Sequence, residues 1–168
     1  MSRNNIILCG FMGSGKTTIG KLIAEFLKMD FIDTDDDICL KLNMSINEIF
    51  NNYGEEYFRK LENYEVSLIS KYQFKVIASG GGTFLNRENA LKLSKSGKIF
   101  FLKANIATIK SRLKGDNKRP LLKNLDDSLL EELFSKRNKL YESTCDIIID
   151  ANKSKELVCK DIIRHLKN

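Results

Sequence analysis

The sequence contains one histidine, one proline and no tryptophan among its 168 residues. His165 is the only imidazole and lies next to the C-terminus, so the sequence offers little for Ser-His-Asp or Cys-His catalysis. The four cysteines include no CxxC pair, and with a single histidine they do not indicate a zinc site. We predict that Cys9, Cys39, Cys145 and Cys159 are reduced thiols in a cytoplasmic protein.

Long apolar runs are also missing. No segment approaches the roughly 18 apolar residues of a membrane span. The apolar run at residues 5–9 leads directly into a glycine-rich loop, which is not the pattern of a signal peptide. Hydrophobic residues make up 42% and charged residues 30%, as is ordinary for a folded domain with a real core. We therefore expect one domain over residues 1–168 and no membrane partner.

The net charge is +6, from 28 basic and 22 acidic side chains. The lysines are scattered along the chain and form no basic block, which favours a solvated lysine-rich surface. The other interpretation is a local positive field that attracts a nucleotide and an anionic substrate. On this distribution we expect no nucleic-acid partner, and we expect a monomer.

Short apolar runs alternate with amphipathic segments. The runs typical of buried parallel strands are residues 5–9, 31–32, 75–78, 98–102 and 145–149. Apolar residues recur at helical spacing within 19–27, 46–70, 106–113, 126–141 and 158–166. This alternation predicts an α/β fold, with a five-stranded parallel sheet covered by helices on both faces. Ligands of such folds bind at the carboxyl ends of the strands.

A phosphate-binding motif follows the first predicted strand. Residues 10–17 read GFMGSGKT and match G-x-x-x-x-G-K-[ST] in full, between an apolar strand and a helix. Glycines let backbone N–H groups surround phosphate oxygens, the lysine reaches the β- and γ-phosphates, and the threonine hydroxyl binds Mg²⁺. The motif predicts binding of a nucleoside triphosphate with Mg²⁺, and we take ATP as the default nucleotide. The expected nucleotide-binding residues here are Gly13, Ser14, Gly15, Lys16, Thr17 and Thr18.

The motif alone does not separate a kinase from a GTPase or a motor. Residues 138–141 read NKLY and fail the guanine signature N-K-x-D at its last position. Strand 75–78 runs into Ser79 and three glycines, whereas a motor or hydrolytic NTPase usually carries an acid there. These two departures favour a kinase.

Carboxylates instead follow the second predicted strand, at Asp33 and Asp35. Alternate residues of an extended chain point the same way, so both carboxylates would face the phosphate loop. One would then lie near Mg²⁺ and the other would accept a proton from an attacking hydroxyl. Asp33-Thr34-Asp35 is equally typical of a helix N-cap, and this motif alone leaves both interpretations open.

Six motifs together resemble the shikimate kinases in order and spacing. They are GFMGSGKT, then DTD at 33–35, FRKLE at 58–62, GGG at 80–82, RPLL at 119–122 and R-x-x-x-Y at 137–141. The resemblance covers residues 6 to about 150. It implies a three-layer α/β/α fold like that of the P-loop nucleoside-monophosphate kinases. It also implies a substrate-binding helical segment at about 34–62 and a mobile lid at about 113–124.

The implied activity is transfer of the ATP γ-phosphate to the 3-hydroxyl of shikimate, in aromatic amino-acid biosynthesis. A related kinase acting on another hydroxylated acid, such as gluconate, is the nearest alternative. A nucleotide-binding module without catalysis would need a missing lysine or base, yet Lys16, Asp33 and Asp35 are present. A nucleic-acid-dependent ATPase is a third alternative, and the scattered charge argues against it.

The resemblance implies a role for each remaining site residue. Asp35 would act as base, Asp33 would lie near Mg²⁺ through water, and Lys16 would complete the catalytic group with Arg119. Arg119 would reach the ATP phosphates from the lid, and Arg112 would flank adenine. The implied substrate-binding residues are Asp35, Arg59, Gly80, Gly81, Gly82 and Arg137, with the two arginines clamping the substrate carboxylate and Gly81 bonding through its backbone.

Each of these residues taken alone also fits a structural role. Arg59 would pair with Glu62 three residues along a helix, Arg137 would be a surface residue, and the three glycines would form a plain turn. Residues 114–124 are polar and hold Pro120, which predicts a loop. Two positions depart from the family. Cys145 stands where alanine is frequent, and residues 150–155 lack the proline found near adenine in many members.

Overall fold

The computed structural model describes residues 3–113 and 127–167. Most of the expected lid, Arg119 included, lies outside the described residues. The described strands are β1 (Asn5–Cys9), β2 (Asp30–Asp33), β3 (Lys75–Ala78), β4 (Gly97–Lys103) and β5 (Ile147–Asp150). The helices are α1 (Lys16–Leu27), α2 (Thr34–Leu42), α3 (Ile46–Ile69), η1 (Thr83–Leu85), α4 (Arg87–Ser96), α5 (Ile106–Leu113), α7 (Asp127–Thr144) and α8 (Lys155–Lys167).

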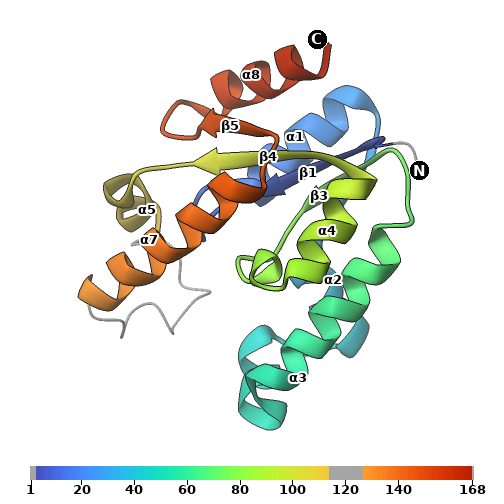
Figure 1. Cartoon of the computed structure of the whole chain (residues 1–168), viewed down its shortest axis with the longest axis vertical. Helices are drawn as coiled ribbons and strands as arrows, with labels where there is room; N and C mark the ends of the chain where they lie inside the picture. Colours follow the sequence, from blue (N-terminus) through green and yellow to red (C-terminus); the bar gives the residue numbers. More distant parts are fainter. Residues whose placement is uncertain (1–2, 114–126, 168) are drawn as a thin grey trace.

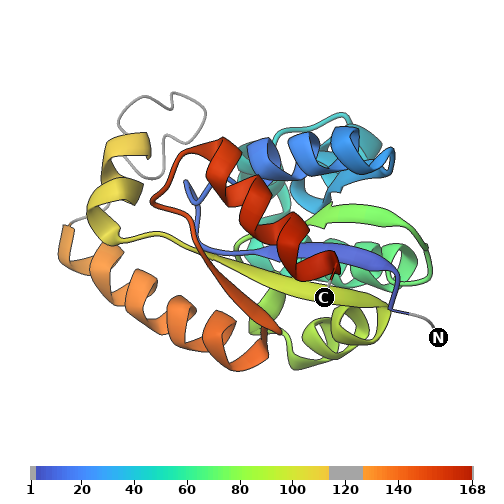
Figure 2. The same cartoon turned by 90° about the horizontal axis from the view of Figure 1, so that it is seen from above.

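All neighbouring strands of the sheet are parallel, in the order β2-β3-β1-β4-β5. Helices α1 and α8 cover one face, and α4 and α7 cover the other (Figures 1 and 2). All five residues of β1 are buried, as expected of a central strand covered on both faces. The predicted three-layer α/β/α arrangement with a five-stranded parallel sheet is confirmed.

The core lies along the three middle strands. Ile7, Leu8, Ile77, Phe100 and Phe101 are fully buried there. Each such side chain stabilises the fold by about 1.5–3 kcal/mol relative to an exposed position. Because β3 lies between β2 and β1, the segments that follow these strands meet at one edge of the sheet. These segments are the phosphate loop, the start of α2 and the triple glycine.

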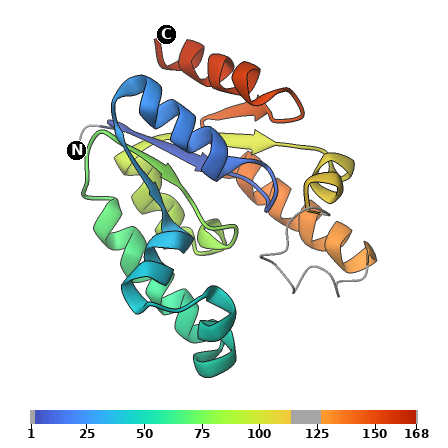
Figure 3. The same cartoon turned by 180° about the vertical axis from the view of Figure 1, so that it is seen from behind.

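Helix α2 and the beginning of α3 project away from the sheet (Figure 3), whereas the end of α3 joins the main core through Val66 and Ile69. A small separate core of Ile38, Ile49 and Phe58 holds α2 and α3 together. Helix α3 begins at a capping box in which Ser45 and Glu48 exchange hydrogen bonds. Gly54 interrupts α3 with φ 82° and ψ 168°, so the helix bends there.

The strand predictions hold at β1 and β3 and differ by one residue at each end of β2 and β4. Strand β5 begins at Ile147, two residues later than predicted, because the Cys145 N–H still bonds the Tyr141 carbonyl at the end of α7 and Asp146 forms the link to the sheet. Helix α4 was not predicted. Its buried residues include Asn89 and Ser96 beside Ala90 and Leu93, so its apolar periodicity is weak. No helix within residues 3–113 and 127–167 is long and apolar enough to cross a membrane.

Candidate functional site

The phosphate loop joins β1 to α1. Gly15 caps α1 in the left-handed region, with φ 99°, a conformation that is costly for a residue with a side chain. The Lys16 ammonium donates to the carbonyl oxygens of Gly10 (2.7 Å) and Phe11 (3.2 Å), so it lies over the loop. The Ser14 hydroxyl is buried and has no hydrogen-bond partner among the described residues. A helix N-terminus at such a loop suits an anionic phosphate.

Asp33, the last residue of β2, connects the phosphate loop with α2. Its Oδ2 accepts a 2.6 Å hydrogen bond from the Thr17 hydroxyl, and its Oδ1 accepts from the backbone N–H groups of Asp35 and Asp36. Asp33 is therefore the N-cap of α2 and also a neighbour of the predicted metal ligand. The N-cap interpretation is confirmed for Asp33, and its role near Mg²⁺ stays a prediction.

Asp35 belongs to the first turn of α2, so the extended-chain prediction for the two carboxylates is wrong. In this turn the Asp35 carboxylate lies beside the triple glycine. A Cβ atom at Gly80 would overlap Asp35 Oδ1 and would lie 3.0 Å from its Cγ. The Gly80 N–H donates a 2.8 Å hydrogen bond to the Thr34 hydroxyl, which fixes α2 to the glycine turn.

Two guanidinium groups reach the same turn. A Cβ atom at Gly81 would lie 3.2 Å from Arg137 Nη1, and one at Gly82 would lie 2.7 Å from Arg59 Cζ. With Asp35 at Gly80, each glycine faces one of the three predicted substrate-binding side chains. The triple glycine is therefore a surface on which an acid and two arginines converge, and the absence of side chains makes room for them.

Arg59 is held by acidic neighbours on its own helix. Its guanidinium donates to Glu55 Oε1 (2.9 Å) and Glu62 Oε2 (2.9 Å), and the buried Glu62 also accepts from the Thr83 hydroxyl (2.7 Å). Partial burial opposes the charge of Arg59, but these carboxylates outweigh it and raise its pKa. The ion pair between Arg59 and Glu62 that we expected from their spacing is therefore present. It holds the Arg59 guanidinium next to Gly82.

Arg137 comes from α7 and is not a surface residue. Its guanidinium lies over the Phe11 ring at 5.8 Å, and its buried Nε has no hydrogen-bond partner among the described residues. One turn along, the buried Tyr141 hydroxyl donates a 2.6 Å hydrogen bond to the Gly81 carbonyl. Burial raises the pKa of Tyr141, so it remains a donor. Sequence reasoning gave Tyr141 no role, although the i, i+4 spacing from Arg137 placed both on one face.

A hollow of about 200 Å³ opens beside the phosphate loop. Arg112 crosses it, donating to the carbonyl oxygens of Ala151 (2.8 Å), Gly13 and Ser14. Its lining consists of Ser14, Gly15, Thr18, Ile19, Arg112, Ala151, Lys153, Lys155 and Val158. Lys153 lies in the turn between β5 and α8, and Lys155 is the first residue of α8; neither was among the predicted site residues. This hollow contains the predicted adenine neighbour Arg112 and is large enough for part of a nucleotide base.

A second, shallower hollow of about 340 Å³ is lined by Cys39, Leu40, Asn43, Met44 and Ser45. It contains none of the predicted site residues. No group of three His, Cys, Asp or Glu side chains within residues 3–113 and 127–167 is arranged to hold a metal ion. The hydrogen-bonded oxygens of Thr17 and Asp33 lie side by side next to the phosphate loop.

The chain is similar to known proteins over most of its length. A family model for shikimate kinase matches residues 12–167. The shikimate kinase of Caldicellulosiruptor saccharolyticus is 45% identical over 161 residues, which cover 95% of this chain and 93% of that protein. A solved shikimate kinase from Acinetobacter baumannii in complex with shikimate shows 31% identity and a TM-score of 0.91, covering 99% of this chain and 95% of its own.

A solved gluconokinase from Sinorhizobium meliloti is more distant, at 15% identity and a TM-score of 0.56. The alignment covers 94% of this chain and 88% of the gluconokinase chain. This likeness concerns the fold alone.

Proposed function

The chain belongs to the shikimate kinase family, and from this premise we propose that it transfers the γ-phosphate of ATP to the 3-hydroxyl of shikimate. One observation carries the substrate assignment. Asp35, Arg59 and Arg137 converge on the three glycines that follow β3, next to the phosphate loop. This arrangement pairs a proton acceptor with two groups that bind a carboxylate, which is the chemistry that a hydroxylated cyclic acid requires.

In the proposed mechanism the backbone N–H groups of residues 13–17 and the Lys16 ammonium hold the ATP phosphates. Arg59 and Arg137 bind the shikimate carboxylate and so orient its ring over the glycine turn. The substrate hydroxyl oxygen then forms a bond to the γ-phosphorus as the bond to the ADP oxygen breaks, and Asp35 accepts the hydroxyl proton. Because such transition states are loose, positioning and electrostatics account for most of the catalysis.

Thr17 and Asp33 are proposed to hold Mg²⁺, with Asp33 acting through water. When bound with ATP, Mg²⁺ neutralises charge on the phosphate oxygens. Replacing Thr17 with Val removes the hydroxyl but keeps the shape. We expect the Mg²⁺ concentration for half-maximal turnover to rise by about 10-fold or more. Thr17→Ser, which keeps the hydroxyl, should need the same Mg²⁺ concentration as the wild type. If Thr17→Val also needs the same Mg²⁺ concentration as the wild type, Thr17 does not bind Mg²⁺.

Gly82→Ala tests whether Arg59 acts at the glycine turn. Position 82 has φ −100° and ψ −10°, which alanine adopts readily, so we expect little change in the melting temperature. The added methyl group would displace the Arg59 guanidinium, because the new Cβ atom would lie only 2.7 Å from Arg59 Cζ. The KM for shikimate should rise by about 10-fold or more while the KM for ATP stays the same. A shikimate KM equal to that of the wild type would contradict the proposed clamp.

Substrate identity is tested by ADP release with ATP and Mg²⁺ in three parallel reactions: with shikimate, with gluconate and with no acceptor. Turnover that requires shikimate supports the proposal. Turnover of gluconate without shikimate turnover would favour the alternative. ADP release in the absence of any acceptor would indicate an ATPase, and stimulation by DNA or RNA would support the nucleic-acid-dependent class.

The remaining assignments complete the proposal. Residues 1–168 are proposed to form one domain, with a substrate-binding helical segment at about 34–62 and a lid at about 113–124. From this lid, Arg119 would reach the ATP phosphates. Arg112, with the hollow beside it, is proposed to hold adenine. We also propose a monomeric, cytoplasmic enzyme. In support of this location, all four cysteines are free thiols, as a reducing compartment would keep them.

A further inference from the structure

A buried acid lies on α3 apart from the catalytic groups. Glu65 is only 2% exposed. Its Oε2 accepts a 2.5 Å hydrogen bond from the Lys41 ammonium of α2, whereas its Oε1 is buried and has no hydrogen-bond partner among the described residues. Lys41 also pairs with Asp37 Oδ2 at 2.7 Å. One ammonium group thus bridges two carboxyl groups, one of which is almost fully removed from water.

This arrangement is short of positive charge if both carboxyl groups are ionised. Burying a carboxylate is costly unless its charge and its hydrogen bonds are compensated. A proton on Glu65 resolves both deficits, because the carboxyl O–H then donates to Asp37 and the remaining charges balance. Burial, followed by the neighbouring Asp37, raises the pKa of Glu65. For Asp37 the effect of burial is outweighed by hydrogen bonds with Glu65 and Lys41, and its pKa is lowered.

Charged groups on the other neighbouring elements are already engaged. On α3 itself, Glu62 pairs with Arg59. On α4, which packs against the other side of α3, Lys92 contacts Ser67 and Glu88. Among the described residues, Asp37 and Lys41 are therefore the groups that act on the charge of Glu65.

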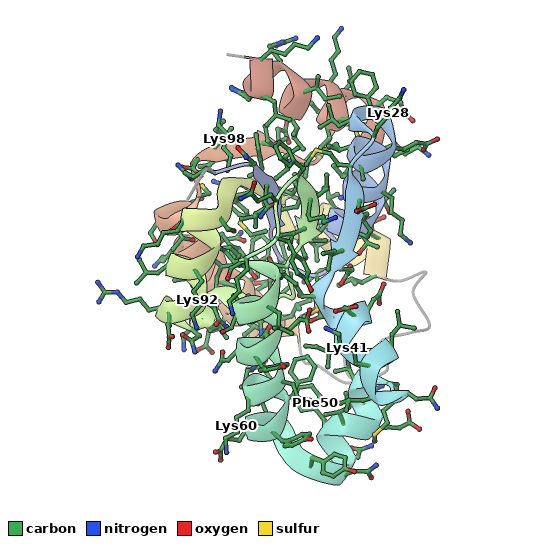
Figure 4. The ribbon with its side chains drawn as sticks, turned by 90° about the vertical axis from the view of Figure 1, so that its right-hand side faces the viewer. Lys28, Lys41, Phe50, Lys60, Lys92 and Lys98 are labelled. Carbon is green, nitrogen blue, oxygen red and sulfur yellow. The ribbon has the colours of Figure 1, made fainter. Side chains whose placement is uncertain are left out.

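The position of these residues on α2 gives them a functional consequence. Helix α2 is attached at its start, where Thr34 bonds the Gly80 N–H, and near its end, where Lys41 bonds Glu65. Ile38 packs between these points against α3. Asp35 lies between the two attachments, so loss of the second one would free α2 to move and would displace the Asp35 carboxylate from the glycine turn. Figure 4 shows Lys41 between α2 and α3, whereas Lys60 points outward.

We propose that Asp37, Lys41 and Glu65 form a positioning cluster, with one proton held on Glu65, that fixes α2 against α3 and holds Asp35 at the glycine turn. The inference rests on the proposed function of Asp35 as base. Glu65 is a positioning residue in this scheme, since it acts on the reacting groups only through α2.

The proton has a consequence for stability with a definite sign. The folded state favours protonated Glu65, so protonation of Glu65 adds to the free energy of unfolding. This stabilisation is fully present below the ordinary glutamate pKa of about 4.3. It is lost as the pH rises through the raised pKa of Glu65. Glu65→Gln mimics the neutral acid in shape and hydrogen bonding. Its free energy of unfolding should therefore not fall over the pH range in which Glu65 of the wild type loses its proton.

Three variants of α3 test the cluster. We expect Glu65→Gln to keep kcat within about threefold of the wild type at neutral pH, and Glu65→Ala to lower kcat by about 10- to 100-fold through misplacement of Asp35. Affinity for an ATP analogue, which binds at the far end of the site, should be unchanged in both. Glu56→Gln is the matched control, because Glu56 forms an exposed pair with Lys60 on the same helix, and it should behave as the wild type.

Several results would overturn the inference. Equal loss of kcat in Glu65→Gln and Glu65→Ala would mean that the carboxylate, and not the neutral acid, is required. Wild-type kcat in folded Glu65→Ala would leave only a structural role. The unmodified protein supplies a measurement that depends on neither folding of variants nor activity. Carbon NMR of labelled glutamate side chains should show one carboxyl group that titrates above the ordinary glutamate range and disappears in Glu65→Gln. If every glutamate titrates in the ordinary range, the held proton is refuted, whatever the substrate proves to be.

Discussion

Asp35→Asn is expected to lower kcat by about 10²–10⁴, the range for removal of a general base. The substitution keeps the size and shape of the side chain that packs against Gly80. An amide, however, does not accept the hydroxyl proton at neutral pH. Single-turnover measurement of phosphate transfer should show the loss in the chemical step. Shikimate affinity by calorimetry should change much less, because Arg59 and Arg137 supply the carboxylate contacts.

Asp36→Asn is the matched control for this prediction. Asp36 is exposed and occupies the same first turn of α2, where its backbone N–H also bonds the cap Asp33. The control removes the same charge at nearly the same place, so it measures the effect of the local electrostatic field alone. We expect kcat within about threefold of the wild type for Asp36→Asn, in line with surface substitutions elsewhere. Near-normal kcat in Asp35→Asn would remove Asp35 from the role of base.

The phosphate loop and the central strands were predictable from the sequence because their signals are local. A buried parallel strand requires a continuous apolar run, as in β1 and β3, and the glycines and Lys16 of the loop occur within eight residues. Helix α4 lacked such a signal, since Asn89 and Ser96 occupy half of its buried face. Local sequence patterns thus predict a helix or strand correctly where its buried residues are also its hydrophobic residues.

The substrate side of the site depends on strand order, which no local pattern encodes. Asp35 faces Gly80 because β2 pairs with β3 in the sheet. The alternation argument failed for Asp35 because α2 begins immediately after Asp33, and a helical turn aims the side chain differently from an extended chain. The resemblance to a known family supplied the candidate residues here, and their roles stay predictions. Physical reasoning from the sequence alone supplied their chemistry but not their convergence.

Buried charges were the least predictable feature. Glu62 and Glu65 are each 2% exposed. In the sequence they lie in a helical segment rich in charged residues, and such residues are ordinarily exposed to solvent. What keeps them inside are partners from elsewhere in the chain, namely Thr83 for Glu62 and Lys41 for Glu65. Such pairings follow from tertiary packing of α2, α3 and η1, so only coordinates reveal them.

Arg137→Ala is expected to weaken shikimate binding by about 2–5 kcal/mol, as found when one partner of a desolvated charge pair is removed. The guanidinium lies over Phe11 with its Nε buried, and a planar carboxylate can engage its Nη donors as a fork. Arg137→Lys keeps the charge but loses the fork and the stacking, and should recover only part of the affinity.

Calorimetric titration of shikimate into each variant measures the effect directly. Lys136→Ala is the matched control, because Lys136 is the exposed neighbour on α7 and its loss removes one positive charge without touching the glycine turn. If general electrostatic attraction drew the substrate in, Lys136→Ala and Arg137→Ala would weaken binding alike, and salt would weaken both further. A specific clamp instead leaves Lys136→Ala unchanged. An unaltered Kd for Arg137→Ala would show that the carboxylate is bound elsewhere, and the convergence on the glycine turn would then have to serve another ligand.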